Sequence, residues 1–217
     1  MKRLLFGSRR SSPAALLTRI SVVFYGAMTA VAVGLMAWRG DLGLMAPAAE
    51  SWWIGKGAPG DVPGLIGLGL LLAFLVVWIT RLPAVGEASW GSFLEERMQE
   101  AMAGLKPRHA VLLALLSGFG EEMLFRGVLQ IWLVDHLGAT GGWVLASLVF
   151  GAVHTGSDRR FLLWMGFSAV VGLLLGGLLI VTGSLIAPIS LHAGVNGLNL
   201  LVQAWEERMQ ARSVSRR

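Results

Sequence analysis

The sequence predicts an all-α membrane protein: a polytopic helical bundle with about six transmembrane helices. Of its 217 residues, 55% are hydrophobic and 14% are charged, whereas soluble domains carry about 25% charged residues. The mean hydropathy is +0.67. Along the chain, long apolar runs alternate with short polar segments, and an apolar run of about 20 residues is what a helix needs to cross a bilayer.

The first part of the chain predicts two spans. Residues 1–19 form a basic tail that we expect to be cytoplasmic. The apolar run that follows, 20–38, is too long for the apolar core of a signal peptide and is predicted to be the first span. A loop rich in Gly, Ala and Pro over 40–61 leads to a second span over 64–80.

The longest polar connection, 82–108, predicts an amphipathic helix. Ser92 and Glu95 fit a capping box, and apolar and charged residues then share the segment as far as Leu105. Such a helix lies at the membrane interface or on the surface of the bundle. A substrate gate is the less favoured reading. Residues 20–106 are therefore expected to form two spans plus this connection.

Residues 107–203 predict four further spans, and 204–217 a basic cytoplasmic tail. The apolar run 143–154 is short for a full crossing, so we expect its helix to start earlier, to be tilted, or to end below the membrane surface. Gly172 and Gly176 are four residues apart, which favours close packing between helices. The predicted spans are 109–134, 143–154, 161–182 and 184–203.

Charge indicates the orientation of these spans. With the N-terminus inside, 15 of the 18 Lys and Arg residues fall on the inner side, as the positive-inside rule requires. Both termini are therefore predicted to be cytoplasmic, in the inner membrane if the protein is bacterial. The basic residues form no stripe with interleaved aromatics, which argues against a nucleic-acid partner. The absence of Cys excludes thiolate nucleophiles, disulfides and Cys-based zinc sites.

Three ionisable residues lie within six positions of the third span: Glu121, Glu122 and Arg126. Such groups at membrane depth cost several kcal/mol unless they face a partner or water, so they indicate function. Glu122 and Arg126 are four apart on one helix face and are predicted to form a buried structural pair. Glu121 points about 100° away and remains available for chemistry.

Three more polar side chains are expected at similar depth. His154 lies at the inner end of its span, and His192 and Asn196 share one face of the last span. Each alone has an ordinary alternative, a hydrogen bond between helices. Their combination with Glu121 favours a single site in a cavity that opens to the cytoplasm.

These residue types suit hydrolysis of an amide bond. A buried carboxylate takes a proton from water, and a neighbouring imidazole orients that water or protonates the leaving amine. A second imidazole and an amide donate hydrogen bonds to the oxyanion. Alternatively, Glu121, His154 and His192 could hold a divalent metal such as zinc. The sequence lacks His-Glu-x-x-His, which excludes a zincin-type site but not a dispersed one.

The sequence resembles the CPBP family of intramembrane proteases, the CAAX-processing and bacteriocin-processing enzymes also called the Abi family. Three motifs in order carry the resemblance, which covers about Pro107 to Gln203. They are Glu121-Glu122-x-x-x-Arg126, Phe150-x-x-x-His154, and His192-x-x-x-Asn196 after Gly183-Ser184-Leu185.

This resemblance implies that Glu121 and His154 activate water while His192 and Asn196 bind the oxyanion. It leaves open whether the enzyme depends on a metal; we favour water activated by the glutamate. The expected partners are the lipid bilayer and a peptide or membrane-protein substrate. If the chain is bacterial, small peptides, prepeptides or membrane-protein tails are favoured over prenylated CAAX proteins.

The same residues fit two other functions. A non-enzymatic scaffold or bacteriocin self-immunity protein would keep the fold and use the polar cluster to bind a partner. A small ion or solute carrier would use the buried Glu and His residues as a proton relay. The carrier is disfavoured because the sequence shows no inverted repeat.

Overall fold

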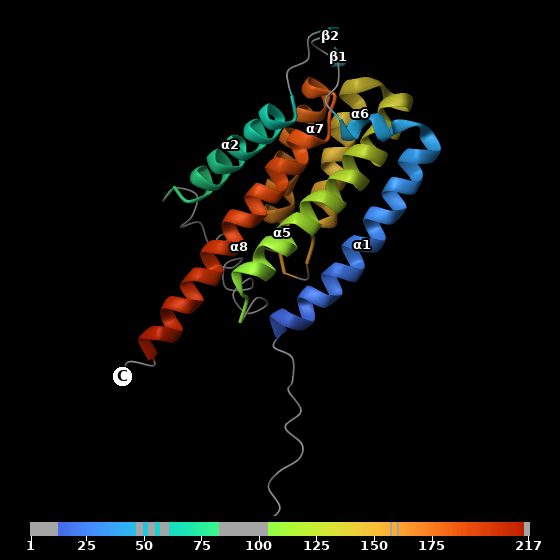
Figure 1. The fold of residues 1–217 in the computed structure, drawn as a ribbon. Coiled ribbons are helices and arrows are strands. Elements are labelled where there is room, and N and C mark those ends of the chain that lie inside the picture. The colour runs from blue at the N-terminus through green and yellow to red at the C-terminus, as the bar shows by residue number, and fades with distance from the viewer. Residues whose placement is uncertain are drawn as a thin grey trace, which may run out of the picture.

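The computed structural model describes residues 13–46, 50–51, 55–56, 61–82, 104–156, 158–159 and 161–214 (Figure 1). The predicted amphipathic connection lies almost entirely outside the described residues, as do most of the N-terminal tail and the last three residues of the C-terminal one. The described chain is almost wholly helical, so the predicted all-α class is confirmed.

The N-terminal part contains two long helices. Helix α1 (Pro13–Arg39) starts before the predicted span, because Pro13 is compatible with a first helical turn. A short 3₁₀ helix η1 (Asp41–Met45) follows, and then two-residue strands β1 (Glu50–Ser51) and β2 (Gly55–Lys56) pair antiparallel. Helix α2 (Val62–Thr80) is capped by Asp61, whose side chain accepts a hydrogen bond from the Gly64 amide at 2.7 Å.

The C-terminal part begins with α5 (Pro107–Glu122), which continues as the π-helix η2 (Met123–Gln130) and then as α6 (Ile131–Val153). One residue of this long segment, Gly138, leaves the helical conformation, with φ 73° and ψ 170°. The predicted short span 143–154 therefore starts earlier, directly after this break. Helices α7 (Phe161–Thr182) and α8 (Ile186–Val214) complete the described chain.

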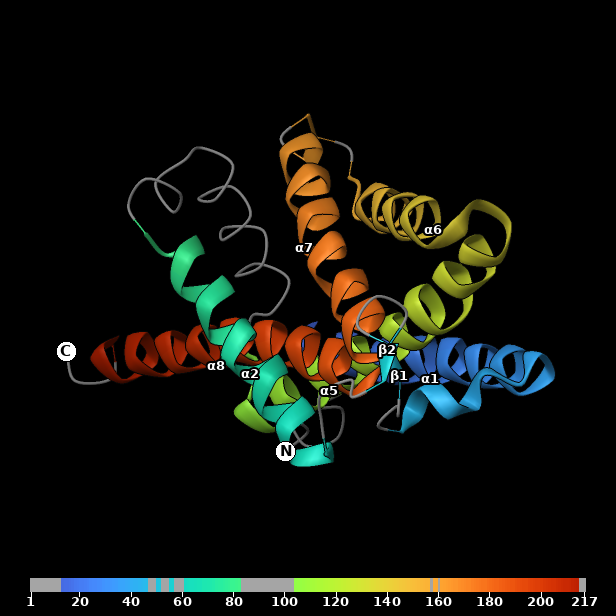
Figure 2. The same ribbon diagram turned by 90° about the horizontal axis from the view of Figure 1, so that it is seen from above.

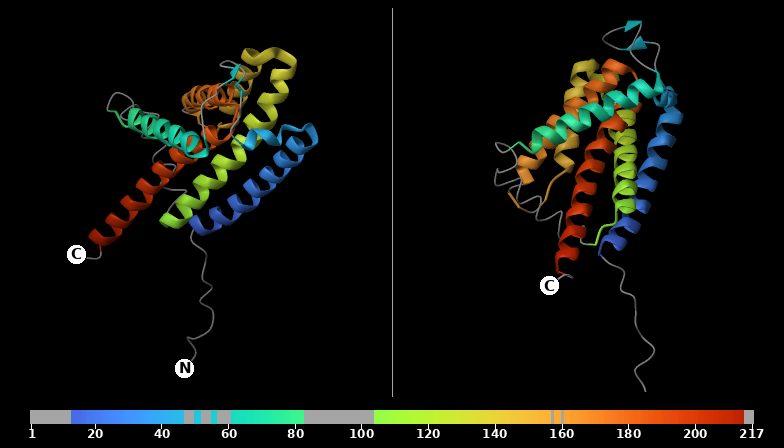
Figure 3. Two further views of the ribbon diagram at one scale, coloured as in Figure 1. Left: turned by 45° about the horizontal axis from the view of Figure 1, so that its top comes forward. Right: turned by 60° about the vertical axis from the view of Figure 1, so that its left-hand side comes forward.

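Helices α1, α5 and α8 lie side by side (Figures 1 and 3). Helix α2 packs on the other side of α8, and α6 and α7 pack on each other (Figure 2). The start of α6 reaches the end of α1, where Asp135 pairs with Arg39. The start of α1 and the end of α8 lie at the same end of the bundle, in agreement with two termini on one side of the membrane (Figure 1). Which side is cytoplasmic remains a prediction.

Glycines let α8 approach both of its neighbours. A Cβ at Gly118 of α5 would lie 2.7 Å from the Ala193 amide nitrogen, and one at Gly69 of α2 would lie 2.5 Å from the Ala187 carbonyl oxygen. A Cβ at Gly194 would in turn meet Ala73 at 2.6 Å. Because Ala193 directly follows His192, the contact between Gly118 and Ala193 holds His192 close to α5.

Apolar side chains such as Phe24, Phe74 and Trp78 remain exposed on the outer faces of the bundle, as lipid-facing helices require. Four helical segments of the described residues are long and apolar enough to cross a membrane: Ala14–Arg39, Val62–Thr80, Pro107–Val153 and Phe161–Thr182. The architecture is an all-α membrane bundle, but the predicted count of six spans is not confirmed. Helix α8, which carries His192 and Asn196, is not among the four.

Candidate active site

The site is built where α5 passes into η2. Glu121 and Glu122 are the last residues of α5, and Arg126 lies inside the π-helix. π-Helical turns are rare and frequent at functional sites. In this one, Arg126 and Gln130 both turn towards α7, where they donate to the carbonyl oxygens of Gly172 and Gly176 at 3.0 and 3.1 Å.

Glu122 and Arg126 form the predicted ion pair, and neither side chain is exposed at all. Arg126 Nη1 donates to Glu122 Oε1 at 3.3 Å, and its Nε lies 3.3 Å from Oε2. The guanidinium also lies over the Phe150 ring, 4.2 Å from its centroid. Within the described part of the chain, Glu122 Oε2 and Arg126 Nε are buried without a hydrogen-bond partner, so the pair depends on the attraction between its charges, and removing one partner leaves the other uncompensated.

Glu122 also binds the site's most buried imidazole. Its Oε1 lies 2.7 Å from His192 Nδ1. The spacing in the sequence did not predict this contact, which joins residues 70 positions apart. The Glu122 carboxylate therefore orients the His192 ring in addition to neutralising Arg126. In functional histidines, a hydrogen bond from one ring nitrogen to a carboxylate determines the state of the other nitrogen.

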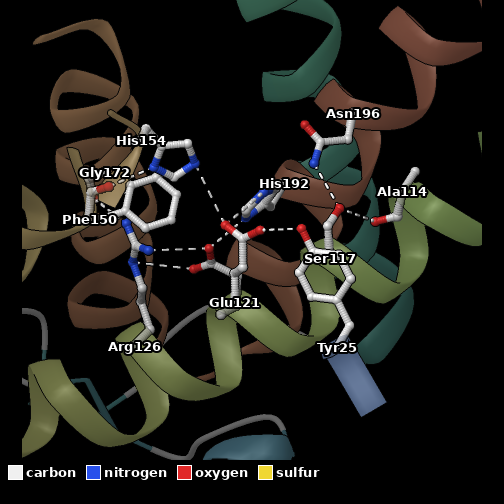
Figure 4. Close-up of polar contacts among 11 residues, drawn as sticks. Tyr25, Ala114, Ser117, Glu121, Arg126, Phe150, His154, Gly172, His192 and Asn196 are labelled. Atoms are coloured by element: carbon white, nitrogen blue, oxygen red, sulfur yellow. Dashed lines mark hydrogen bonds and ion pairs between the residues drawn. The ribbon is translucent and has the colours of Figure 1, made fainter. Parts of the chain in front are cut away.

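Glu121 faces both histidines. Its Oε2 lies 3.8 Å from His154 Nε2 and 3.9 Å from His192 Nε2, and Oε1 accepts a hydrogen bond from the Tyr25 hydroxyl at 2.9 Å (Figure 4). The side chains of Glu121, His154 and His192 are 14%, 25% and 9% exposed. Glu121 and His154 are therefore partly exposed and His192 keeps slight exposure, whereas the Glu122–Arg126 pair is completely buried.

The hydrogen bonds of the two rings determine what faces Glu121. His154 Nδ1 lies 2.7 Å from the Phe150 carbonyl oxygen, and His192 Nδ1 contacts the Glu122 carboxylate. Both of these partners are acceptors, so each Nδ1 carries a hydrogen and each neutral ring presents an unprotonated Nε2. With both rings neutral, three acceptor atoms therefore face one another, and a water molecule can donate to two of them. If His192 is also protonated at Nε2, a water molecule fits all three: it donates to Glu121 Oε2 and His154 Nε2 and accepts from His192 Nε2.

Phe150 of the second motif holds the two rings in place. Its centroid lies 4.6 Å from that of His154 and 5.9 Å from that of His192, and Phe125 packs edge-on against its other side at 5.1 Å. The ring therefore forms an apolar wall between the imidazoles and Arg126.

Asn196 lies beside this cluster and not within its contacts. As predicted, it follows His192 by one turn of α8, but its Nδ2 donates to Ser117 Oγ at 2.8 Å (Figure 4). Ser117 in turn donates to the Ala114 carbonyl oxygen at 3.3 Å. The amide nitrogen has two hydrogens, and this bond uses one of them. The structure thus brings together Glu121, His154 and His192, with Asn196 on the Ser117 side in the view of Figure 4.

The donor types around Glu121 are those that zinc accepts, but their spacing is wide. Ligand atoms of a tetrahedral zinc site lie about 3.3 Å apart, given bonds of about 2.0–2.1 Å, whereas the separations here are 3.8 and 3.9 Å. Among the described residues, no group of three or more His, Cys, Asp or Glu side chains is arranged to hold a metal ion. In this geometry the three side chains do not form a tetrahedral zinc site.

Sequence reasoning missed two polar neighbours of the site, Tyr25 and Ser117. Tyr25 is the single tyrosine of the chain, but it lies 96 residues before Glu121, and no local spacing links them. Ser117 is four residues before Glu121, and its position in a polar gap of an apolar run was the one available signal.

Residues 105–198 match a family model described as type II CAAX prenyl endopeptidase Rce1-like. The chain is also 42% identical over 84 residues to the uncharacterized protein YpbD of Bacillus subtilis (strain 168). That stretch covers 39% of this chain and 40% of the relative. No solved structure matches the chain. The resemblance to the CPBP family, predicted from three motifs, is confirmed for this segment.

Proposed function

We propose that residues 105–198, which match the Rce1-like endopeptidase family, are the catalytic core of an intramembrane endopeptidase. The observation that carries the proposal is the convergence of Glu121, His154 and His192, with Glu121 Oε2 3.8 and 3.9 Å from the two Nε2 atoms. A transporter or scaffold does not require a carboxylate and two imidazoles held at the distance of a single bridging water.

Glu121 is the proposed general base. A water that donates to its Oε2 lies at ordinary hydrogen-bond length, about 2.6–3.2 Å between heavy atoms. Glu121 takes a proton as the water oxygen attacks the carbonyl carbon of the substrate. His154 is the most exposed of the three, at 25%; in this proposal it accepts that proton from Glu121 and passes it to the leaving amine.

His192 and Asn196 are the proposed oxyanion donors. In this role His192 is in its protonated form, with a hydrogen on both ring nitrogens: Nδ1–H donates to Glu122, 2.7 Å away, and Nε2–H donates to the oxyanion. Asn196 donates one amide hydrogen to Ser117 and the other to the same oxygen. The breakdown of the tetrahedral intermediate releases a carboxylic acid and an amine. The substrate is a membrane-associated protein or peptide, since the residues around the site belong to a bundle with lipid-facing outer surfaces.

The test is cleavage of a quenched-fluorescent peptide library by the detergent-purified full chain. The variants are Glu121→Gln, His154→Ala and His192→Ala, each with and without a strong chelator. Asp135→Asn is the matched control, because it makes the same acid-to-amide change at an exposed carboxylate that pairs with Arg39. We expect Glu121→Gln to lose about 10²- to 10⁴-fold in kcat/KM, the usual size of a general-base contribution.

The outcomes separate the alternatives. Activity that is lost in Glu121→Gln and retained in chelator supports a glutamate-type peptidase. Activity that chelator removes and zinc restores supports a metallopeptidase and contradicts metal-free activation of water. Cleavage that is equal in wild type and Glu121→Gln contradicts the assignment of Glu121 and favours a scaffold or self-immunity protein.

A further inference from the structure

Helix α1 lies outside the matched family segment, yet one of its faces packs directly against the motif that carries Glu121. The inward-facing residues recur at helical spacing, and two of them, Ala32 and Met36, are fully buried. The face consists of Tyr25, Met28, Thr29, Ala32 and Met36. This face contacts α5 and η2, so these contacts determine which side chains of α1 reach the site.

Two glycines of the motif allow the approach of α1. A Cβ at Gly120 would lie 3.0 Å from Met28 Cε, 3.1 Å from Thr29 Oγ1 and 3.4 Å from Tyr25 Cδ1. A Cβ at Gly127, seven residues later, would lie 2.7 Å from Met36 Sδ. Because Gly120 is the residue before Glu121, this close packing brings the Tyr25 ring to Glu121.

The Tyr25 hydroxyl binds the one oxygen of Glu121 that the histidines do not face. It donates to Oε1 at 2.9 Å, while Oε2 faces His154 and His192. The last torsion of a glutamate side chain is broad and roughly two-fold, so the carboxylate has no preferred direction of its own. The hydrogen bond from Tyr25 supplies one. The phenol is a neutral donor, so it orients Glu121 without forming the ion pair that Arg126 makes with Glu122.

We propose that Tyr25 is a positioning residue for Glu121 and that α1 thereby completes the active site of the family-matched segment. Its kinetic consequence rests on the proposed peptidase function, whereas the contact itself does not. Two measurements therefore test the proposal separately.

The first measurement tests the contact without any activity. Because Tyr25 is the single tyrosine, growth on 3-fluorotyrosine labels the full chain at one position. We expect the ¹⁹F resonance of the folded, detergent-purified protein to move in Glu121→Gln and to stay in place in Asp135→Asn. A resonance that is unchanged in Glu121→Gln would overturn the proposal.

The second measurement tests positioning. Tyr25→Phe keeps the ring and removes the hydroxyl, and we expect kcat to fall about 10- to 100-fold with KM unchanged, as a small misplacement of a reacting group does. Thr29→Val is the matched control, since it removes a hydroxyl from the same face of α1, one turn further on. Its kcat and KM should equal those of the wild type.

Equal kcat in Tyr25→Phe and wild type would overturn the positioning role, even if the fluorine resonance responds to Glu121→Gln. An equal loss in Tyr25→Phe and Thr29→Val would overturn it as well, because it would indicate a general effect of α1 packing. If no peptide is cleaved by the wild type, the proposed function fails, while the fluorine measurement still decides whether Tyr25 binds Glu121.

Discussion

Glu121 and Glu122 are adjacent and chemically identical, yet the fold gives them opposite surroundings. Glu122 is completely buried and contacts the guanidinium of Arg126 and the ring of His192. Glu121 is 14% exposed and faces a phenol and two imidazole nitrogens. One residue step on a helix, about 100°, produces this difference. Glu122, which Arg126 neutralises, therefore has a structural role, and Glu121, which forms no ion pair with Arg126, remains available as a base.

The two regions are nevertheless connected. His192 contacts Glu122 through Nδ1 and faces Glu121 through Nε2, so the sealed pair determines the direction of a ring in the accessible site. Damage to the sealed region should therefore reduce stability and activity together. Damage to the accessible region should reduce activity alone. The following substitutions test that distinction.

The largest effect is expected from Arg126→Met. It leaves Glu122 as a buried charge without its cation and removes the hydrogen bond to the Gly172 carbonyl. Loss of one partner of a buried pair costs about 3–5 kcal/mol, a large part of a total stability of about 5–15 kcal/mol. Denaturant titration of the purified protein in detergent should show this loss, and activity should disappear with it.

The double variant Glu122→Gln/Arg126→Met is the control for this prediction. It removes both charges, so we expect it to recover a substantial part of the lost free energy of unfolding. It should not recover activity, because His192 loses the carboxylate that orients it. A double variant that is less stable than Arg126→Met alone would contradict the account of an uncompensated charge.

A smaller effect, on activity alone, is expected in the accessible region. Asn196→Ala should lose about 10²- to 10³-fold in kcat, as the removal of a single oxyanion donor does. Its free energy of unfolding should change little. The measurement is kcat beside denaturant titration of the same samples. A stability loss without a kcat loss would instead make Asn196 a contact between α8 and α5 through Ser117.

Ser117→Ala tests whether Ser117 acts only by orienting Asn196, the proposed oxyanion donor. Ser117 accepts from Asn196 at 2.8 Å but has no proposed contact with the substrate. One such neutral hydrogen bond contributes about 0.5–1.5 kcal/mol, which corresponds to a kcat loss of about 10-fold or less. We expect KM to remain unchanged. A loss as large as that in Asn196→Ala would contradict a merely orienting role for Ser117.

Local spacing predicted those parts of the site that lie on one helix. The four-residue separation of Glu122 and Arg126 predicted their pairing, and that of His192 and Asn196 predicted a shared face. The separation of Gly172 and Gly176 predicted close packing, and a Cβ at Gly176 would lie 2.5 Å from Gln130 Oε1. Each of these predictions follows from helical periodicity alone, which puts residues four positions apart on the same face.

Contacts between distant helices could not be predicted in the same way. Tyr25 reaches Glu121 across 96 residues and His192 reaches Glu122 across 70, so both contacts depend on how α1 and α8 pack on α5. The sequence did not predict the π-helix, because its residues do not differ in type or spacing from those of an ordinary α-helix. The predicted count of six spans is not confirmed. Gly138 interrupts a helical segment that is otherwise continuous, and α8 is too polar to be among the four apolar segments.

The smallest effect is expected from Asp135→Asn, at the rim of the bundle. Asp135 Oδ2 lies 2.6 Å from Arg39 Nη2 and joins the end of α1 to α6, but the Asp135 side chain is 52% exposed. Arg39 keeps its second partner, Asp41, at 2.7 Å. An exposed pair contributes about 0–1 kcal/mol, so unfolding and kcat should both remain close to wild type. A loss comparable to that of Arg126→Met would mean that α1 is held by its exposed end and not by its buried face. The distinction between sealed and accessible regions would then fail, and Tyr25 would reach Glu121 only while this ion pair is formed.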